Sequence, residues 1–315
     1  MENEEHAVTH NSDHQWIPMR REEVDPKLME VISAVLDMFP NLPVSVHKIM
    51  SMAYDPKTCA REIAEIASSD PVLVSGILKK VNSAYYSLDH KIENLNLAIV
   101  VLGFNEVRDV AIQCGLAEKL GKQKDHIEYN TRGLWGHSYA VSVCAESLAK
   151  DKKSKHTGIL MTIAMLHDIG KFALYTIGMH AKRLGMKAHG IHDMSPDASL
   201  LEKEERLFGV NHAIVGGMLA QKWNLSDRIS AVLEYHHYPS FFPIGEVPED
   251  YRENVASISI ADSIEHRITE TPNILPKPQP EYFEVAGIPP SISKLITPEL
   301  QVKLERAKEF LNEID

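Results

Sequence analysis

The sequence predicts an all-α protein with a multi-helical core. Apolar residues recur at the spacing of an amphipathic helix over most of the chain, and no stretch keeps the alternation of a half-buried strand. Several of these stretches begin with Asp-Pro or Thr-Pro, the usual arrangement of an N-cap and a first helical turn. With 315 residues and 44% hydrophobic content, the chain can form one large or two smaller domains.

Five or six helices are expected in the first part of the chain, after a polar tail over residues 1–21. Asp25-Pro26 starts the first helix, and Phe39-Pro40 ends it. Asp70-Pro71 starts another, which ends before Ser83. The other apolar-periodic stretches are Val44 to Met52, Thr58 to Ala67, Leu95 to Val101 and Asn105 to Leu120. Together they predict an N-terminal helical subdomain over residues 22–122.

A second helical subdomain is expected over residues 123–270, after a polar linker that begins at Gly121. Its helices are Leu134 to Leu148, Leu160 to Ile177, Leu200 to Phe208, His212 to Trp223, Ser226 to Tyr235 and Val255 to Ile268. Residues 271–315 form a Pro-rich segment and a C-terminal helix. We expect no compact core element before Pro290, and Thr297-Pro298 starts the last helix.

The net charge of −11 argues against binding to a nucleic-acid backbone, because such binding needs Lys and Arg to neutralise phosphates. The three cysteines, Cys59, Cys114 and Cys144, form no C-x-x-C pair and are typical of reduced cytosolic thiols. No apolar run approaches the roughly 20 residues that cross a bilayer. The start of the chain also lacks the pattern of a signal peptide. We therefore expect a soluble, cytoplasmic protein that binds no membrane.

The pair His167-Asp168 lies between apolar residues, where neither side chain belongs by default. Burying a carboxylate beside an imidazole is costly unless each finds a charge, a hydrogen bond or a metal ion. Further His and Asp residues lie on or directly after other expected helices, and they are His137, His212, His236, His237 and Asp262. Ligands scattered over several helices are typical of metal sites in helical proteins.

Such a site would hold one or two divalent transition metal ions. Mixed imidazole and carboxylate ligands suit Fe, Mn, Zn or Ni better than Ca or Mg, without choosing among the four. We expect Asp168 to bridge two ions. Gly170 would let another backbone approach closely, and Lys171 would either contact a phosphate or lie with its ammonium group at the helix surface. The alternative for the same residues is a metal-free, hydrogen-bonded core.

At these residues the chain resembles the HD superfamily of metal-dependent phosphohydrolases, whose signature is a His, then His-Asp, then a distant Asp. His137, His167-Asp168 and Asp262 match that order. His212 and the pair His236-His237 match the positions that hold a second ion in two-metal members such as HD-GYP phosphodiesterases. No Gly-Tyr-Pro motif follows this pair, and its absence argues against hydrolysis of cyclic-di-GMP.

A closer resemblance, over about residues 35 to 240, is to the HDOD family, or HD-related output domain. Four segments match its pattern in order, and they are Phe39 to Pro43, Ile66 to Leu73, Val81 to Tyr86 and Ala98 to Gly103. Members of that family act mostly in bacterial signalling and often lack metal ligands, whereas here the ligand set is complete.

The resemblance implies a regulatory protein that retains an HD-type metal site, binds a protein partner of a signalling pathway and could hold a small phosphorylated ligand. The alternative is an active metal-dependent phosphohydrolase or phosphodiesterase that acts on a nucleotide or another phosphate ester. In that alternative Asp168 and Lys171 would be the catalytic residues.

Overall fold

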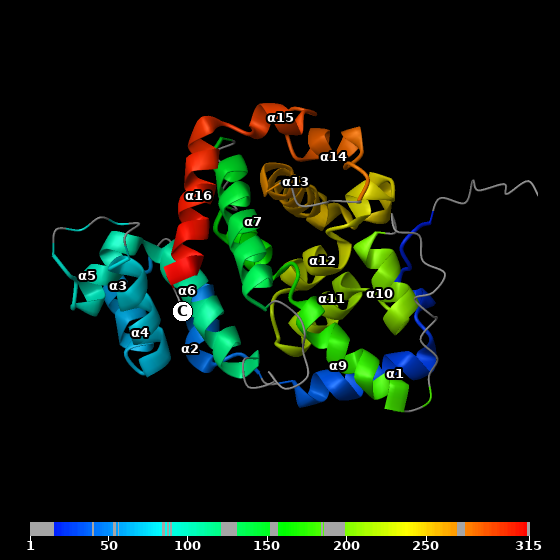
Figure 1. The fold of residues 1–315 in the computed structure, drawn as a ribbon, viewed down its shortest axis with the longest axis horizontal. Coiled ribbons are helices and arrows are strands. Elements are labelled where there is room, and N and C mark those ends of the chain that lie inside the picture. The colour runs from blue at the N-terminus through cyan, green and yellow to red at the C-terminus, as the bar shows by residue number, and fades with distance from the viewer. Residues whose placement is uncertain are drawn as a thin grey trace, which may run out of the picture.

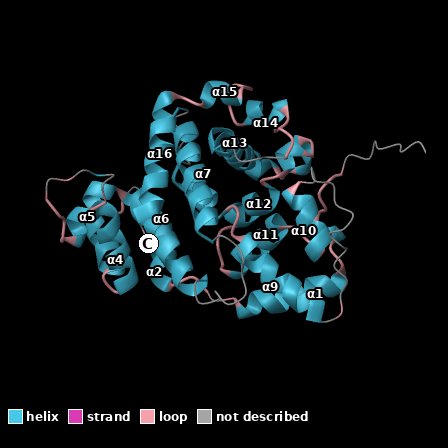
Figure 2. Ribbon diagram, viewed as in Figure 1, coloured by secondary structure: helices cyan, strands magenta, loops and turns pink. Residues whose placement is uncertain are grey.

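The computed structural model describes residues 16–39, 41–52, 57–83, 90–120, 131–151, 157–183, 199–269 and 275–313, together with Asp55, Tyr86, Leu88 and Gly185. Over these residues the protein has helices and no β-strand, so the all-α prediction is confirmed (Figure 2). The first fifteen residues of the predicted tail and the predicted linker from Gly121 lie outside the described residues. Among the described helices, none combines the length and the apolar character that crossing a bilayer requires.

The first part of the chain forms six helices, and they are α1 Pro26–Met38, α2 Val44–Met52, α3 Ala60–Ala67, α4 Pro71–Val81, α5 Leu95–Leu102 and α6 Phe104–Leu120. The two Asp-Pro signals act as predicted. Asp25 caps α1 and Asp70 caps α4, because each side chain accepts hydrogen bonds from two backbone N–H groups in the first turn of its helix. Both helices therefore begin at the predicted proline.

The second part of the chain forms ten helices within the described residues. They are α7 Thr131–Asp151, α8 Thr157–Leu166, α9 Gly170–Arg183, α10 Leu200–Phe208, α11 His212–Lys222, α12 Asp227–Tyr235, α13 Arg252–Thr269, α14 Pro280–Val285, α15 Ile292–Leu295 and α16 Pro298–Glu313. Helix α7 packs on α8, α13 and α16, and α11 packs on α9 and α12 (Figure 1). The predicted metal ligands lie on or directly beside α7, α8, α9, α11, α12 and α13.

One predicted helix, Leu160 to Ile177, is interrupted. A turn over residues 167–169 separates α8 from α9, and a backbone hydrogen bond from the Ile169 N–H group to the Leu166 carbonyl oxygen closes it. The apolar pattern continues through the turn without change, so periodicity alone does not reveal it. The interruption places the His-Asp pair in the turn, outside both helices.

The prediction that the Pro-rich segment holds no core element is wrong. Helix α14 lies in this segment and packs on α13. Its Tyr282 side chain is fully buried, and the hydroxyl group donates a hydrogen bond to the Phe242 carbonyl oxygen at 3.0 Å. Pro280 is tolerated because it occupies the first helical position, where a backbone N–H group has no intrahelical partner.

Helix α1 lies with the second part of the chain. It packs on α9 and α11, whereas α2 to α6 pack against one another at the other end of the molecule (Figure 1). The predicted subdomain over residues 22–122 therefore includes a helix that is packed elsewhere. The buried residues Leu28, Ile32 and Leu36 give α1 an apolar face, but such a face does not specify its partner.

The segment Trp16–Val24 is also packed on the second part of the chain. Trp16 makes an edge contact with Phe241, the Met19 N–H group donates to Glu205, and Arg20 forms an ion pair with Glu246 at 3.0 Å. The predicted solvated tail over residues 1–21 is thus too long at its C-terminal end. The segment is too short to show a helical or strand periodicity, so its apolar residues Trp16, Met19 and Val24 do not indicate docking.

A buried charged cluster connects α4 and α6 with α7. The Lys80 ammonium group lies 3.1 Å from the Tyr139 hydroxyl and 3.4 Å from a Glu106 carboxylate oxygen. In the same cluster Arg108 pairs with Asp109 Oδ1 at 2.8 Å, whereas Asp109 Oδ2 is buried without a hydrogen-bond partner. Burial raises the pKa of Asp109 to about 7, although the Arg108 charge acts in the opposite direction.

Through Asp109 we expect the protein to lose stability as the pH rises from about 4 to about 7. In this window the native carboxyl group keeps a proton that the unfolded chain releases. The stabilisation is therefore fully present below the unfolded pKa and is lost as the pH rises through the native pKa. The pKa of about 7 already includes the effect of the Arg108 charge, and the full change is on the order of 4 kcal/mol.

Urea unfolding of the wild type and of Asp109→Asn, at about pH 5 and about pH 8, measures this effect. The free energy of unfolding of the variant should fall less between the two pH values than that of the wild type. An equal pH dependence in the two proteins would contradict the assignment.

Candidate metal centre

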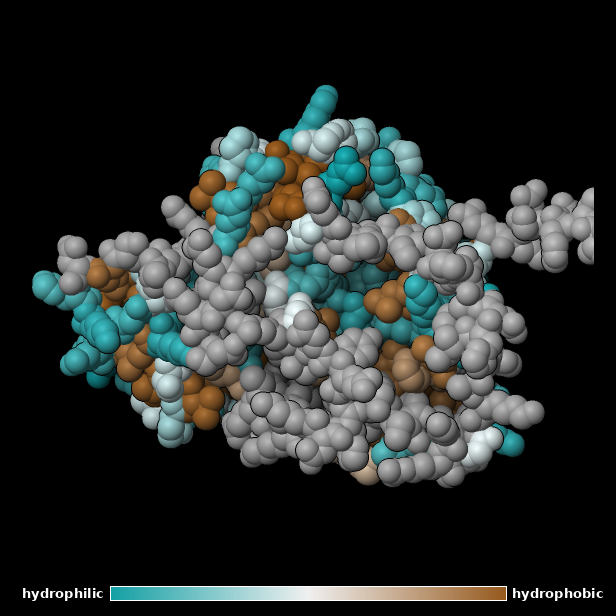
Figure 3. Space-filling view, viewed as in Figure 1, coloured by the Kyte–Doolittle hydropathy of each residue, from teal (hydrophilic) through white to brown (hydrophobic). Residues whose placement is uncertain are grey.

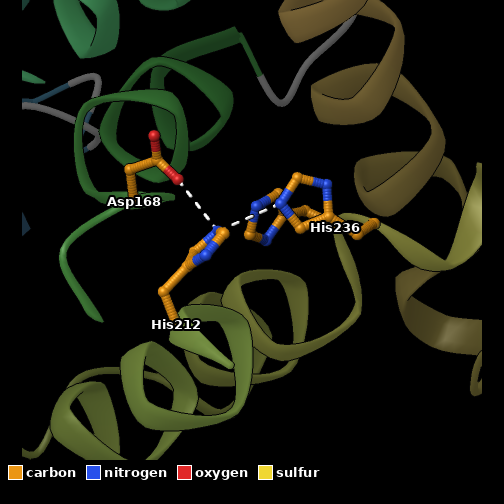
Figure 4. A group of neighbouring side chains, drawn as sticks. Asp168, His212 and His236 are labelled. Atoms are coloured by element: carbon orange, nitrogen blue, oxygen red, sulfur yellow. Dashed lines mark hydrogen bonds and ion pairs between the residues drawn. The ribbon is translucent and has the colours of Figure 1, made fainter. Parts of the chain in front are cut away.

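The seven predicted metal ligands lie in one cluster. His137 is on α7, His167 and Asp168 are in the turn between α8 and α9, His212 is the first residue of α11, His236 and His237 directly follow α12, and Asp262 is on α13. Figure 4 shows three of them, Asp168, His212 and His236, pointing toward one another from separate elements. Five separate parts of the chain therefore meet at this point.

The donor atoms form two groups. The inner group consists of Asp168, His212, His236 and His237, and the outer group consists of His137, His167 and Asp262. Within each group the donor atoms lie within 4.8 Å of one another. The inner ligands are buried, whereas the His137 side chain is 17% exposed. Each group has the mixture of imidazole and carboxylate donors that suits a divalent transition metal.

Most of the histidine rings are held in a defined orientation. In four of them the Nδ1 atom faces a fixed acceptor, which requires this nitrogen to carry the proton and leaves Nε2 to face the cluster. The pairs are His137 with Glu265 Oε2 (3.0 Å), His167 with the Ala164 carbonyl (2.6 Å), His212 with Glu204 Oε2 (2.6 Å) and His236 with the Leu233 carbonyl (2.7 Å). The rings are thus arranged with their Nε2 atoms directed toward a common centre.

The inner group contains a polar atom that the protein itself does not satisfy. His236 Nε2 is buried and has no hydrogen-bond partner, whereas the buried Asp168 Oδ1 lies 3.1 Å from His212 Nε2. Burial and the neighbouring His167 and His212 rings lower the pKa of His236 to about 3, so its imidazole is neutral. A buried acceptor without a donor is costly in a hydrogen-bonded core, but it is what a cation requires. The inner group therefore fits a metal ion better than a metal-free core.

The outer group carries a proton where a cation could bind. His137 Nε2 lies 3.2 Å from His167 Nε2 and 3.2 Å from Asp262 Oδ1. Burial acts to lower the pKa of His137, but hydrogen bonds with Asp262 and Glu265 outweigh it and raise the pKa to about 10. An ion bound by His137 would displace this proton, so metal binding at the outer group should release it.

Asp168 lies between the two groups. Its Oδ1 atom is 3.1 Å from His212 Nε2 in the inner group, and Oδ2 is 3.5 Å from both His137 Nε2 and His167 Nε2 in the outer group. This placement is what the predicted bridging role requires. Burial acts to raise the pKa of Asp168, but the nearby Lys171 charge and the neighbouring histidines hold the pKa well below its usual range.

Lys171 pairs directly with Asp168 Oδ2. Its side chain is only 13% exposed, so the predicted alternative of an ammonium group at the helix surface is wrong. Contact with a phosphate stays a prediction. The mostly buried ion pair explains why burial does not lower the pKa of Lys171 overall: the carboxylate charges of Asp168 and Glu204 raise it.

Gly170 allows the backbones of α9 and α11 to approach closely, as predicted. A Cβ atom at this position would overlap the His212 carbonyl oxygen and lie 2.6 Å from the Gly216 backbone nitrogen. Because Gly170 follows Asp168 by two residues, this close approach holds the turn with the His-Asp pair against the start of α11. The glycine thereby sets the distance between two inner ligands.

Sequence reasoning misses three residues of the cluster, Glu204, Glu265 and His266. Glu204 and Glu265 orient histidine ligands, and His266 Nδ1 lies 3.0 Å from Asp262 Oδ1. A weak signal exists for Glu204, because it lies one helical turn after the buried Leu201 on α10. Glutamates in a charged helix otherwise look like a solvated face.

Within the described residues, the side of the outer group is the more exposed part of the cluster. The His137 and His266 side chains are 17% and 22% exposed, in contrast to the buried inner ligands. In Figure 3, hydrophilic side chains gather in a recess in the middle of the visible face, over the region where α7, α11 and α12 meet. A small polar ligand could therefore approach the outer group first.

Comparison with solved structures reveals the same fold in several bacterial proteins. An HDOD domain protein of unknown function from Geobacter sulfurreducens is 21% identical, with a TM-score of 0.67 over 92% of this chain and 97% of its own. A candidate phosphohydrolase from Shewanella amazonensis is 19% identical, with a TM-score of 0.59 over 90% and 98% of the two chains. A candidate signal transduction protein from Marinobacter aquaeolei is 16% identical, with a TM-score of 0.68 over 92% and 67%.

An uncharacterized protein of Treponema pallidum is 24% identical over 242 residues, which are 75% of this chain and 44% of that protein. The chain thus spans less than half the length of this curated relative. The family model for the HDOD domain matches residues 39–239, a range that includes every predicted ligand except Asp262. The chain belongs to the HDOD domain family.

Proposed function

We propose that this HDOD protein is a regulatory protein of bacterial signalling whose helical core binds one or two divalent transition metal ions. The observation that carries the proposal is the inner group, in which His236 Nε2 is buried without a partner and Asp168 Oδ1 faces His212 Nε2 among oriented imidazole rings. Fe, Mn, Zn and Ni all suit these donors. The regulatory part of the proposal is supported by membership of the HDOD family and by the fold shared with a candidate signal transduction protein.

Elemental analysis of protein purified without chelators tests the metal site. We expect one or two equivalents of a transition metal, and fewer than about 0.2 equivalents after supply of all four candidate metals would overturn the proposal. Removal of the metal should also lower the midpoint of thermal unfolding, because an ion that binds only the folded state stabilises it. The partner is proposed to be a protein of the signalling pathway, with a small phosphorylated ligand as the expected occupant beside the outer group.

Hydrolysis of a phosphate ester is the second candidate function, favoured by the position of Asp168 between both groups. When bound, two ions would polarise the ester and lower the pKa of a bound water molecule. Lys171, at the edge of the cluster, would hold a phosphate oxygen by its positive charge. Asp168 would supply one carboxylate oxygen to each donor group and so fix their relative position.

Assays with phosphate monoesters, phosphodiesters and cyclic dinucleotides, each with Mn, Fe, Ni or Zn, separate the two functions. The hydrolase function predicts turnover that is lost in Asp168→Ala and retained in His47→Gln. His47 is a suitable control, because it lies outside the cluster and donates a hydrogen bond to the Trp223 carbonyl at 2.7 Å. The regulatory function predicts metal binding without turnover on any of these substrates.

A further inference from the structure

Two adjacent glutamates of α10 have different partners. Glu204 is 2% exposed, and its Oε2 atom accepts hydrogen bonds from both the backbone N–H group and the ring Nδ1–H group of His212, at 2.9 Å and 2.6 Å. Glu205 accepts from the Met19 N–H group at 2.9 Å and from the Asn211 side chain at 2.7 Å. Only Glu204 is in contact with a predicted metal ligand.

The chain direction after α10 makes the contact with His212 feasible. Gly209 follows the helix with a φ of 73°, in the left-handed region that favours glycine, and the chain reverses there. His212 then begins α11, 8 residues after Glu204, and lies within hydrogen-bond distance of it. Asn211 caps α11 independently, because its side chain accepts from the Ile214 N–H group. Asn211 and Glu204 thus satisfy different N–H groups in the first turn of α11, and only Glu204 also contacts the His212 ring.

Hydrogen bonds satisfy only one of the two carboxylate oxygens of Glu204. Its second carboxylate oxygen, Oε1, is buried without a hydrogen-bond partner. Keeping a carboxylate in such a place is costly unless its charge is used nearby. Lys171 and the His212 ring are the positive or polarisable groups that interact with it.

We propose that Glu204 is a positioning residue of the metal centre: it fixes the orientation of the His212 ring, keeps the proton on Nδ1 and so directs the Nε2 lone pair to the inner group. The inference rests on the proposed metal-binding function. Carboxylates that accept the distal ring proton of a histidine ligand also increase its strength as a donor. Glu265 has a comparable contact with His137, but it also lies 3.5 Å from His266, so Glu204 is the sharper case.

Metal affinity of matched variants tests the proposal. Glu204→Gln keeps the size and one acceptor oxygen but removes the charge, and we expect the affinity to fall about tenfold. Glu204→Ala removes the acceptor as well, and we expect a fall of about a hundredfold. Glu205→Gln changes the neighbouring carboxylate, which has no predicted ligand as its partner, and should stay within about twofold of the wild type. Competition for Co²⁺ or Mn²⁺ against a chromogenic chelator measures all four proteins.

A second measurement does not depend on the metal. Proton NMR of the metal-free, 15N-histidine-labelled protein should show a hydrogen-bonded Nδ1 proton for His212, identified by its loss in His212→Gln. The signal should be absent in Glu204→Ala and present in Glu205→Gln. A general loss of structure would instead alter the signals of other buried histidines, so the two effects are distinguishable.

The outcomes separate this inference from the proposed function. If the wild type binds no metal, the proposed function fails and this inference fails with it. If the wild type binds metal and the Glu204 variants bind it equally tightly, the inference alone is overturned. The inference is also overturned if the Nδ1 proton signal of His212 persists in Glu204→Ala.

Discussion

Replacement of Asp168 by Ala should remove metal binding from both donor groups. The carboxylate supplies one oxygen to each group, because Oδ1 faces His212 and Oδ2 faces His137 and His167. The inner group would keep only imidazole donors, and the outer group would lose a shared oxygen. We expect the metal content to fall from one or two equivalents to below about 0.2, as measured by elemental analysis.

The same substitution leaves Lys171 without its ion-pair partner. Removing one member of a buried pair destabilises a protein by about 3–5 kcal/mol, and the partial exposure of Lys171 places the expected loss at about 3 kcal/mol or less. Circular dichroism and thermal unfolding therefore accompany the metal analysis. Asp168→Asn provides a second variant that keeps the shape of the side chain, and it should lose metal even where the fold is retained.

Asp262→Asn is the matched control for the bridging role. Asp262 belongs to the outer group alone, so this variant should keep the ion of the inner group. A protein that binds two ions should thus retain about one equivalent after Asp262→Asn and almost none after Asp168→Ala. Equal metal contents in the two variants would argue against a bridge, and full metal content in Asp168→Ala would contradict the site itself.

Gly170→Ala should destabilise the protein by about 3 kcal/mol or more. The added Cβ atom would overlap the His212 carbonyl oxygen and crowd the Gly216 nitrogen, and neither backbone atom can move without moving α11. Separation of α9 from α11 would also lengthen the 3.1 Å distance between Asp168 and His212. We therefore expect a lower free energy of unfolding in urea together with weaker metal binding.

Gly216→Ala is the control, because it adds the same atom to the opposite side of the same helix contact. A Cβ atom there would have its nearest neighbour, the Gly170 nitrogen, at 3.4 Å, which is an ordinary contact. The change to alanine favours a helical conformation by up to about 1 kcal/mol. The stability of this variant should match or exceed that of the wild type. A similar loss of stability in both variants would show that the effect comes from replacing any glycine of this contact by alanine, and not from the close approach at Gly170.

Features that depend on the residue type and its neighbours in sequence were predictable. Asp25 and Asp70 cap their helices as expected, since a side chain that accepts from the first turn acts within its own segment. The grouping of the His and Asp ligands was also predictable, because polar side chains on apolar faces need common partners.

Features that depend on distant packing were not predictable. The turn at residues 167–169 interrupts a continuous apolar pattern. Helix α1 packs on α9 and not on the helices that follow it in sequence. Glu204 resembles its exposed neighbours in a charged helix until His212 is placed beside it. In each case the deciding interaction joins segments whose contact no local pattern specifies.

The distribution of the ligands along the chain also fixes the order in which the site becomes available during synthesis. Every inner ligand precedes Asp262, which completes the outer group and lies more than a hundred residues after His137. Helix α7, which carries His137, is also covered by α16, which lies still later in the sequence. As the chain leaves the ribosome, the inner group is thus fully translated first, and the outer group is the last part of the centre to be completed.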